Sequence, residues 1–261
     1  MESFFSAVAK CRVRWLDLPG TGTPLVFVHG IGCASSYEYP RVVTDKNFAG
    51  RRAILIDLPG FGYSEKPKDY GYSIKEQAQV VAELISHLKL EKVFLYGHSM
   101  GGSISIEASQ LLAKVLCGLI VSEPNFHPGG GVFSKQICRN TQAEYIAAIH
   151  PAMVAGESGP WAGSLAVAAP WAVWRAADSL MTGNDWLGIF ARFTRPKALI
   201  FGQQSLPDAD FTQIQVMNIM TEVLPDCGHS MSWENPSALA GALAAFCSKQ
   251  DQAENTTSVA P

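Results

Sequence analysis

One serine in this chain is placed between two glycines in a way that suits nucleophilic chemistry. Ser99 lies two residues from both Gly97 and Gly101, after the apolar run 93–96 and before the small-residue segment 102–113. A buried strand that turns directly into a helix bends the backbone sharply, and a serine at that bend holds its hydroxyl out for attack. Glycine suits both flanking positions because a side chain there would collide across the turn. The pattern therefore predicts a nucleophile at a helix start.

A second loop can supply the donors that such a nucleophile needs. The apolar run 25–28 leads into His29-Gly30-Ile31-Gly32, a loop able to present a backbone N–H toward Ser99. Acyl transfer develops negative charge on a carbonyl oxygen, and backbone amides held close to that oxygen stabilise it. We assign this oxyanion hole to the amides of Ile31 and Met100.

A histidine near the other end of the chain is the candidate general base. His229 follows the β-prone run 221–224 and stands just before the last helical segment. An imidazole within reach of a serine hydroxyl takes its proton during attack and later returns it to the leaving group. Nucleophile, oxyanion donors and base thus occur in the chain order of an acyl-transfer site.

With these motifs the chain resembles the α/β-hydrolase superfamily, in particular a serine-nucleophile, esterase-like branch with a helical cap. Residues 57–64, Asp-Leu-Pro-Gly-Phe-Gly-Tyr-Ser, are similar to the loop after the fourth strand in esterases, haloalkane dehalogenases, epoxide hydrolases and C–C hydrolases. The resemblance covers about residues 11–124 and 196–248. Dehalogenases and epoxide hydrolases carry aspartate where this chain has Ser99, so the resemblance favours ester chemistry. The fold alone does not specify a substrate.

Alternating apolar runs and helical segments predict an α/β fold with a doubly wound, mostly parallel sheet. In such sheets the chemistry gathers at the carboxyl ends of the strands, where the candidate residues lie. Ser73 followed by Glu76 predicts a capping box at the start of a helix over 73–88. The expected strands cover residues 11–18, 25–28, 53–56, 93–96, 118–121, 198–201 and 221–224, and the last helix covers 236–247.

The alternation fails between residues 125 and 195, where the resemblance implies a helical cap inserted after the sixth strand. We therefore expect a core of residues 1–124 and 196–248, a cap of 125–195, and a polar, disordered tail of 249–261. A cap rich in aromatic residues can roof an apolar pocket, or its aromatic side chains can simply join cap to core. The candidate pocket residues are Trp161, Trp171, Trp174 and Trp186.

The sequence contains three candidates for the acid that orients His229. Most family members have an aspartate three residues after the glycine that ends the seventh strand, but here Ser205 occupies that position. A hydroxyl cannot stabilise an imidazolium as a carboxylate does. We expect Glu123 to be the acid, with Asp208 and then Asp210 as alternatives. Glu123 follows the sixth strand, and an ordered strand end positions a carboxylate better than a loop does.

Composition narrows the possible partners. The net charge of −3 argues against a nucleic-acid partner. The chain has no run of 18 apolar residues, which argues against a membrane span. Residues 1–5 lack the basic start of a secretion signal, so a cytoplasmic location is expected. The cysteines show no metal-ligand spacing, and we expect neither a metal nor an organic cofactor.

We therefore expect a hydrolase that cleaves a small, neutral carboxylic ester through an acyl-enzyme intermediate. The same residues would serve a C–C bond hydrolase, a lactonase or a perhydrolase. A third hypothesis is a ligand-binding relative without turnover, which Ser205 in the usual acid position keeps open. The partner in the main hypothesis is a small-molecule ester, and the sequence does not indicate the oligomeric state.

Overall fold

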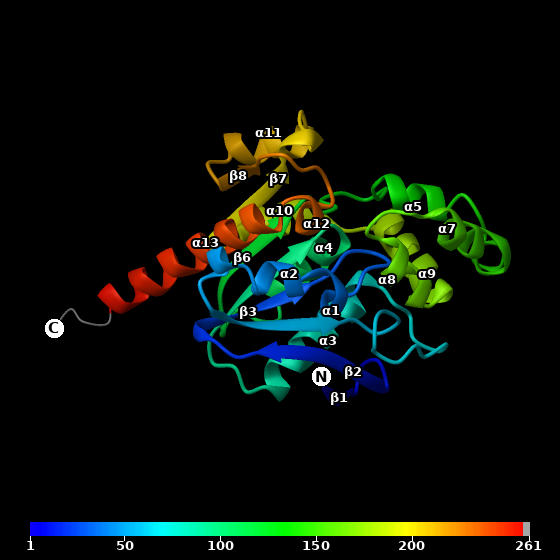
Figure 1. Ribbon diagram of the computed structural model, residues 1–261, viewed down its shortest axis with the longest axis horizontal. Coiled ribbons are helices and arrows are strands. Elements are labelled where there is room, and N and C mark those ends of the chain that lie inside the picture. Colours follow the sequence, from blue (N-terminus) through cyan, green and yellow to red (C-terminus); the bar gives the residue numbers. More distant parts are fainter. Residues whose placement is uncertain (258–261) are drawn as a thin grey trace.

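A central eight-stranded sheet organises the molecule (Figure 1). The computed structural model describes residues 1–257, with side chains through residue 253. The strand order is β1-β2-β4-β3-β5-β6-β7-β8; β1 and β2 are antiparallel to their neighbours and the others run parallel. The strands are β1 (Glu2–Ser6), β2 (Cys11–Leu18), β3 (Thr21–Val28), β4 (Arg51–Asp57), β5 (Val93–His98), β6 (Leu116–Ser122), β7 (Lys197–Gly202) and β8 (Met220–Leu224). The predicted fold class, a doubly wound and mostly parallel α/β sheet, is confirmed.

Helices cover both faces of this sheet, and successive strand residues alternate between two buried cores. On β3, Val26 packs in the core beneath α3 (Ile74–His87) and α4 (Met100–Ser109), whereas Phe27 packs in the core beneath α13 (Pro236–Thr257). The predicted capping box forms at the start of α3, where Ser73 and Glu76 bond reciprocally. The remaining helices of the core are α1 (Ser35–Glu38), α2 (Pro40–Val43), η1 (Lys46–Phe48), η3 (Gln203–Ser205), α11 (Ala209–Val216) and α12 (Met231–Glu234).

All elements between β6 and β7 are helical, and most of them gather beyond one end of the sheet (Figure 1). They are α5 (Val132–Ile137), α6 (Gln142–Glu144), η2 (Tyr145–Ile149), α7 (His150–Gly156), α8 (Ala162–Val167), α9 (Pro170–Thr182) and α10 (Trp186–Arg192). α9 packs against α5, whereas α10 packs against α4 of the core. This insertion lies over the carboxyl ends of the parallel strands, where the candidate site residues are found.

The last helix is longer than the sequence pattern indicates. α13 begins at Pro236 and continues to Thr257, so the expectation of a disordered tail is wrong for residues 249–257. One reason is an ion pair between Arg51 Nη2 and Asp251 Oδ2 at 2.8 Å, which holds this end of the helix on the core. Residues 258–261 of the expected tail lie outside the described residues. Within residues 1–257, no helix has both the length and the apolar character needed to cross a membrane.

Candidate active site

Ser99 stands on a strained turn between β5 and α4. Its backbone angles are φ 53° and ψ −124°, a conformation that L-residues rarely adopt. A Cβ on Gly97 would come within 2.1 Å of the Gly101 carbonyl oxygen, and one on Gly101 within 2.2 Å of the Val28 oxygen. The Ser99 amide donates to the Ser122 carbonyl at 2.9 Å, which ties the turn to β6. Tight packing and this bond hold the serine in its unfavourable conformation.

The close approach at Gly97 leads to a stability prediction. We expect Gly97→Ala to lower the free energy of unfolding by about 1–3 kcal/mol, because the added methyl group meets backbone that cannot move aside. Urea unfolding followed by circular dichroism measures the change. Gly156→Ala is the matched control, since a Cβ there has nothing within 4 Å. Equal stability of Gly97→Ala and the wild type would show that the turn relaxes easily.

Glu123 and His229 are in direct contact. His229 Nδ1 donates to Glu123 Oε2 at 2.6 Å, and the Gly202 amide donates to the other carboxyl oxygen at 2.9 Å. Burial by itself raises the pKa of Glu123, but the bond and charge of His229 together with the Gly202 amide bring the pKa below its ordinary value. Glu123 is therefore held as a carboxylate that fixes the His229 ring, with Nε2 left for another partner.

The alternative acids have other partners. Asp208 caps α11 by accepting from the Phe211 amide at 2.8 Å, and Asp210 bonds to His127 Nε2 at 2.9 Å. Ser205, at the position usual for the acid, lies close enough to Glu123 for its hydroxyl to help lower the pKa of that carboxyl. Of the three carboxylates considered from the sequence, the structure brings only Glu123 to His229.

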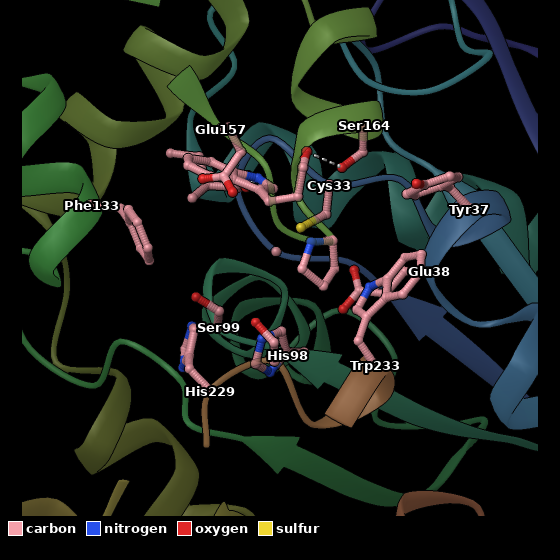
Figure 2. A pocket seen from close by; sticks show the side chains of 15 residues that line it. Cys33, Tyr37, Glu38, His98, Ser99, Phe133, Glu157, Ser164, His229 and Trp233 are labelled. Carbon is pink, nitrogen blue, oxygen red and sulfur yellow. Dashed lines mark hydrogen bonds between the residues drawn. The ribbon is translucent and has the colours of Figure 1, made fainter. Parts of the chain in front are cut away.

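Ser99 and His229 lie next to each other (Figure 2), and both line the same two cavities. Among the described residues no hydrogen bond joins them, and the His229 ring bonds to Glu123. Nucleophile–base bonds are commonly long without substrate and tighten in the complex. Ser99 and His229 are therefore neighbours, as a nucleophile and its general base must be.

The loop after β3 brings Ile31 beside Ser99. A Cβ on Gly30 would lie 3.4 Å from the Ser99 Cβ, so this loop runs directly against the serine. The Ile31 carbonyl accepts from Trp161 Nε1 at 3.0 Å, which ties the loop to the cap. The amides of Ile31 and Met100 donate to no group among the described residues. Two free donors near Ser99 are what an oxyanion hole requires.

A second histidine packs against the candidate base. The centres of the His98 and His229 rings lie 4.6 Å apart, and His98 Nδ1 bonds to Ser122 Oγ at 3.0 Å. Complete burial, followed by repulsion from His229, lowers the pKa of His98 to about 3. His98 therefore stays neutral, and its ring packs against that of His229. Tyr96 also bonds to Ser122 Oγ. No feature of the sequence predicted the bond between His98 and Ser122.

Two cavities meet at Ser99. One has a volume of 160 Å³ and lies between the core and α8, and the other has a volume of 520 Å³ and extends toward α11. Four residues line both: Ile31, Ser99, Phe133 and His229. An ester carbonyl at Ser99 would thus have space on both sides, one for its acyl group and one for its alcohol group. No set of three or more metal-ligating side chains occurs in the part of the chain described.

Of the four candidate tryptophans, Trp161 lines one of these two cavities, and the other three line neither. Trp174 Nε1 donates to the Asn140 carbonyl at 2.9 Å within the cap, and Trp186 Nε1 donates to Glu107 at 3.1 Å across to α4. Trp171 lies beneath the Lys68 ammonium group. The expectation that Trp171, Trp174 and Trp186 line the pocket is wrong, because these rings pack the cap together and onto the core.

Several pocket residues were missed from the sequence. Tyr37 and Glu38 come from α1, and Trp233 comes from α12, four residues after His229. Short helices carry little periodic signal, so none of these residues stood out. The one feature of the sequence that could have indicated Trp233 as a pocket residue is its closeness to the candidate base along the chain.

Comparison with known proteins identifies the family. Residues 25–242, most of the chain, match the model described as the alpha/beta hydrolase family. The chain belongs to this family. Haloalkane dehalogenase 2 from Mycobacterium tuberculosis is 30% identical over 138 residues, which cover 53% of this chain and 47% of that protein. The chain spans about half or less of the length of the curated relatives it matches.

Solved structures share the fold over nearly the whole chain. A thermophilic esterase from Thermogutta terrifontis superposes with a TM-score of 0.77 at 22% identity, covering 96% of this chain and 98% of that one. The N-acyl homoserine lactonase AidH superposes with a TM-score of 0.71 at 20% identity, covering 96% of this chain and 98% of that one. At these identities the similarity establishes the α/β-hydrolase fold, and the chemistry must be argued from the site.

Proposed function

We propose that this hydrolase cleaves small carboxylic esters with Ser99 as its nucleophile, through an acyl-enzyme intermediate. The observation that carries the proposal is the 2.6 Å bond between His229 and Glu123, formed beside a serine on a strained turn. An ordered carboxylate on Nδ1 leaves Nε2 as the proton acceptor for a serine hydroxyl. The esterase neighbours of this fold are in accord with such chemistry.

The first half of the reaction forms the acyl-enzyme. Ser99 Oγ attacks the ester carbonyl carbon while its proton passes to His229, and the amides of Ile31 and Met100 hold the resulting oxyanion. Glu123 stabilises the imidazolium. His229 then gives this proton to the alcohol oxygen as the C–O bond breaks, so the alcohol leaves and the acyl group stays on Ser99.

The second half restores the enzyme. A water molecule attacks the acyl carbon and transfers a proton to His229, and the amides hold the second oxyanion. The bond from the carbon to Ser99 Oγ breaks as His229 returns the proton to that oxygen, and the carboxylic acid leaves. A lactone is the second candidate substrate, because it contains the same bond and the fold neighbour AidH is a lactonase.

Acyl-enzyme formation can be tested directly. We expect the protein to hydrolyse p-nitrophenyl acetate and butyrate, and a fluorophosphonate probe to block turnover while labelling one peptide, which contains Ser99. Mass spectrometry of a protease digest identifies the labelled residue. An absence of both labelling and turnover would favour a ligand-binding protein without catalysis. Label on any other residue would contradict the nucleophile.

A further inference from the structure

Glu38 is a buried carboxyl group that forms no ion pair with the described residues. It ends α1 with 5% of its surface exposed, and Ser232 Oγ donates to its Oε1 at 2.8 Å. Within the described part of the chain it forms no ion pair. Its burial raises the pKa of this carboxyl despite the bonds that Ser232 and Cys33 supply. Fully buried acidic side chains without a cation are rare, because desolvating the charge is costly.

This carboxyl faces the 160 Å³ cavity beside Ser99. Figure 2 shows Glu38 and Glu157 on two sides of that space, one from the core and one from the cap. Glu157 accepts from the Gly159 amide at 2.6 Å, and among the described residues it also forms no ion pair. The lining contains two histidines. His98 stays neutral, and His229 is bonded to Glu123. The lining, which lies wholly within described residues, contains no lysine or arginine.

Aromatic rings form much of the remaining wall. Tyr37, Phe133, Trp161 and Trp233 all line the cavity. The face of an aromatic ring attracts cations through its quadrupole. Trp233 already shows this attraction, since the guanidinium of Arg41 lies 3.5 Å from its ring centre; Arg41 itself is exposed and lines no part of the cavity. Aromatic faces combined with unpaired carboxyl groups suit a positive ligand group and repel a negative one.

We propose that this cavity receives an ammonium group of the ester and that Glu38 is the specificity-determining residue that binds it. The proposal rests on the proposed function, since it concerns substrates that reach Ser99. A bound cation would give the Glu38 carboxylate, which is 5% exposed, a charged partner. The neutral ester expected from the sequence was inferred from the apolar cap, whereas Glu38 comes from a short core helix.

Matched substrates that differ only in charge test the proposal. On the alcohol side we compare 2-(dimethylammonio)ethyl butanoate with 3-methylbutyl butanoate. On the acyl side we compare ethyl 4-(dimethylammonio)butanoate with ethyl 5-methylhexanoate. In each pair a protonated nitrogen replaces one CH group. The readout is the ratio of kcat/KM for the charged ester to that for its carbon isostere, measured with a pH-stat at neutral pH.

In at least one pair, we expect Glu38→Gln to lower this ratio about ten-fold, the typical effect of losing one charge-assisted hydrogen bond. Glu91→Gln removes the same charge from an exposed site and should leave both ratios within two-fold of the wild type. Ratios in Glu38→Gln within two-fold of the wild type for both pairs would overturn the proposal. So would an equal fall in Glu91→Gln.

A binding experiment covers two other outcomes. If Glu38→Gln does not fold, or if the wild type cleaves none of these esters, calorimetric titration of Ser99→Ala still reports on the cavity. We expect the charged member of one pair to bind about ten-fold more tightly than its isostere. Equal binding within both pairs would overturn the inference about Glu38. Absence of turnover with intact charge-selective binding would instead contradict only the proposed function.

Discussion

Ser99→Ala is expected to lower kcat/KM for p-nitrophenyl acetate at least about 10⁴-fold. Without the hydroxyl no acyl-enzyme can form, and the remaining groups can only assist direct attack by water. The oxyanion donors and the cavity are backbone or remote features, so they persist in the variant and account for residual activity. Steady-state kinetics with the purified variant measure the loss, and active-site titration of the wild type supplies the enzyme concentration.

The control for this substitution is Ser86→Ala. Ser86 is an exposed serine of α3, and its removal should leave kcat/KM within two-fold of the wild type. Thermal unfolding should give similar midpoints for the wild type and both variants, because alanine retains the Cβ of residue 99. A Ser99→Ala enzyme that keeps more than about a tenth of the activity would show that another group is the nucleophile.

The strained turn was predictable because its determinants are local. Gly97 and Gly101 are required by contacts within a few residues or with the adjacent strand, and the structure has backbone oxygens within 2.2 Å of an added Cβ at both positions. The apolar runs before and after the turn also carry a clear periodic signal. The sequence around Ser99 thus predicts the bend, and the contact of Gly101 with Val28 on the adjacent strand β3 helps to hold it.

The acid could be ranked from the sequence but not decided. β5, β6 and β7 are neighbours in the sheet, so the residue after β6 necessarily lies near the one after β5. This places Glu123 beside the site from strand order alone. Whether Asp208 or Asp210 reaches His229 depends on loop conformation, which periodicity does not encode. The structure shows that helix capping by Asp208 and the bond from His127 to Asp210 hold these side chains elsewhere.

The pocket was the least predictable part. Composition located the aromatic residues in the cap, but the side of each helix that faces the core depends on packing of the whole insertion. Trp186 illustrates this point, since it is 2% exposed and bonds to Glu107 of α4. Glu38 and Trp233 reach the cavity from helices of four residues, which are too short for a hydrophobic stripe to orient.

Glu123→Gln is expected to lower kcat/KM about 10³- to 10⁴-fold at neutral pH. The amide has nearly the same shape but no charge, so it cannot stabilise the imidazolium that forms when His229 takes the serine proton. It can also present its NH₂ group to Nδ1, which would leave the ring proton on Nε2, the atom that must accept from Ser99. Both effects act on the proton-transfer step, so kcat should fall more than KM changes.

Asp208→Asn provides the comparison that decides the acid. The amide oxygen still caps α11, so the variant should keep its stability and lose less than ten-fold in kcat/KM.

The pKa of Glu123 is depressed in the folded protein, so the stability contributed by its ionised form should be fully present at neutral pH. That stability should be lost as the pH falls through the lowered pKa. Glu123→Gln should lack this acid-dependent loss. A large loss of activity in Asp208→Asn alone would instead mean that the 2.6 Å bond to His229 is structural and that the loop supplies the catalytic acid.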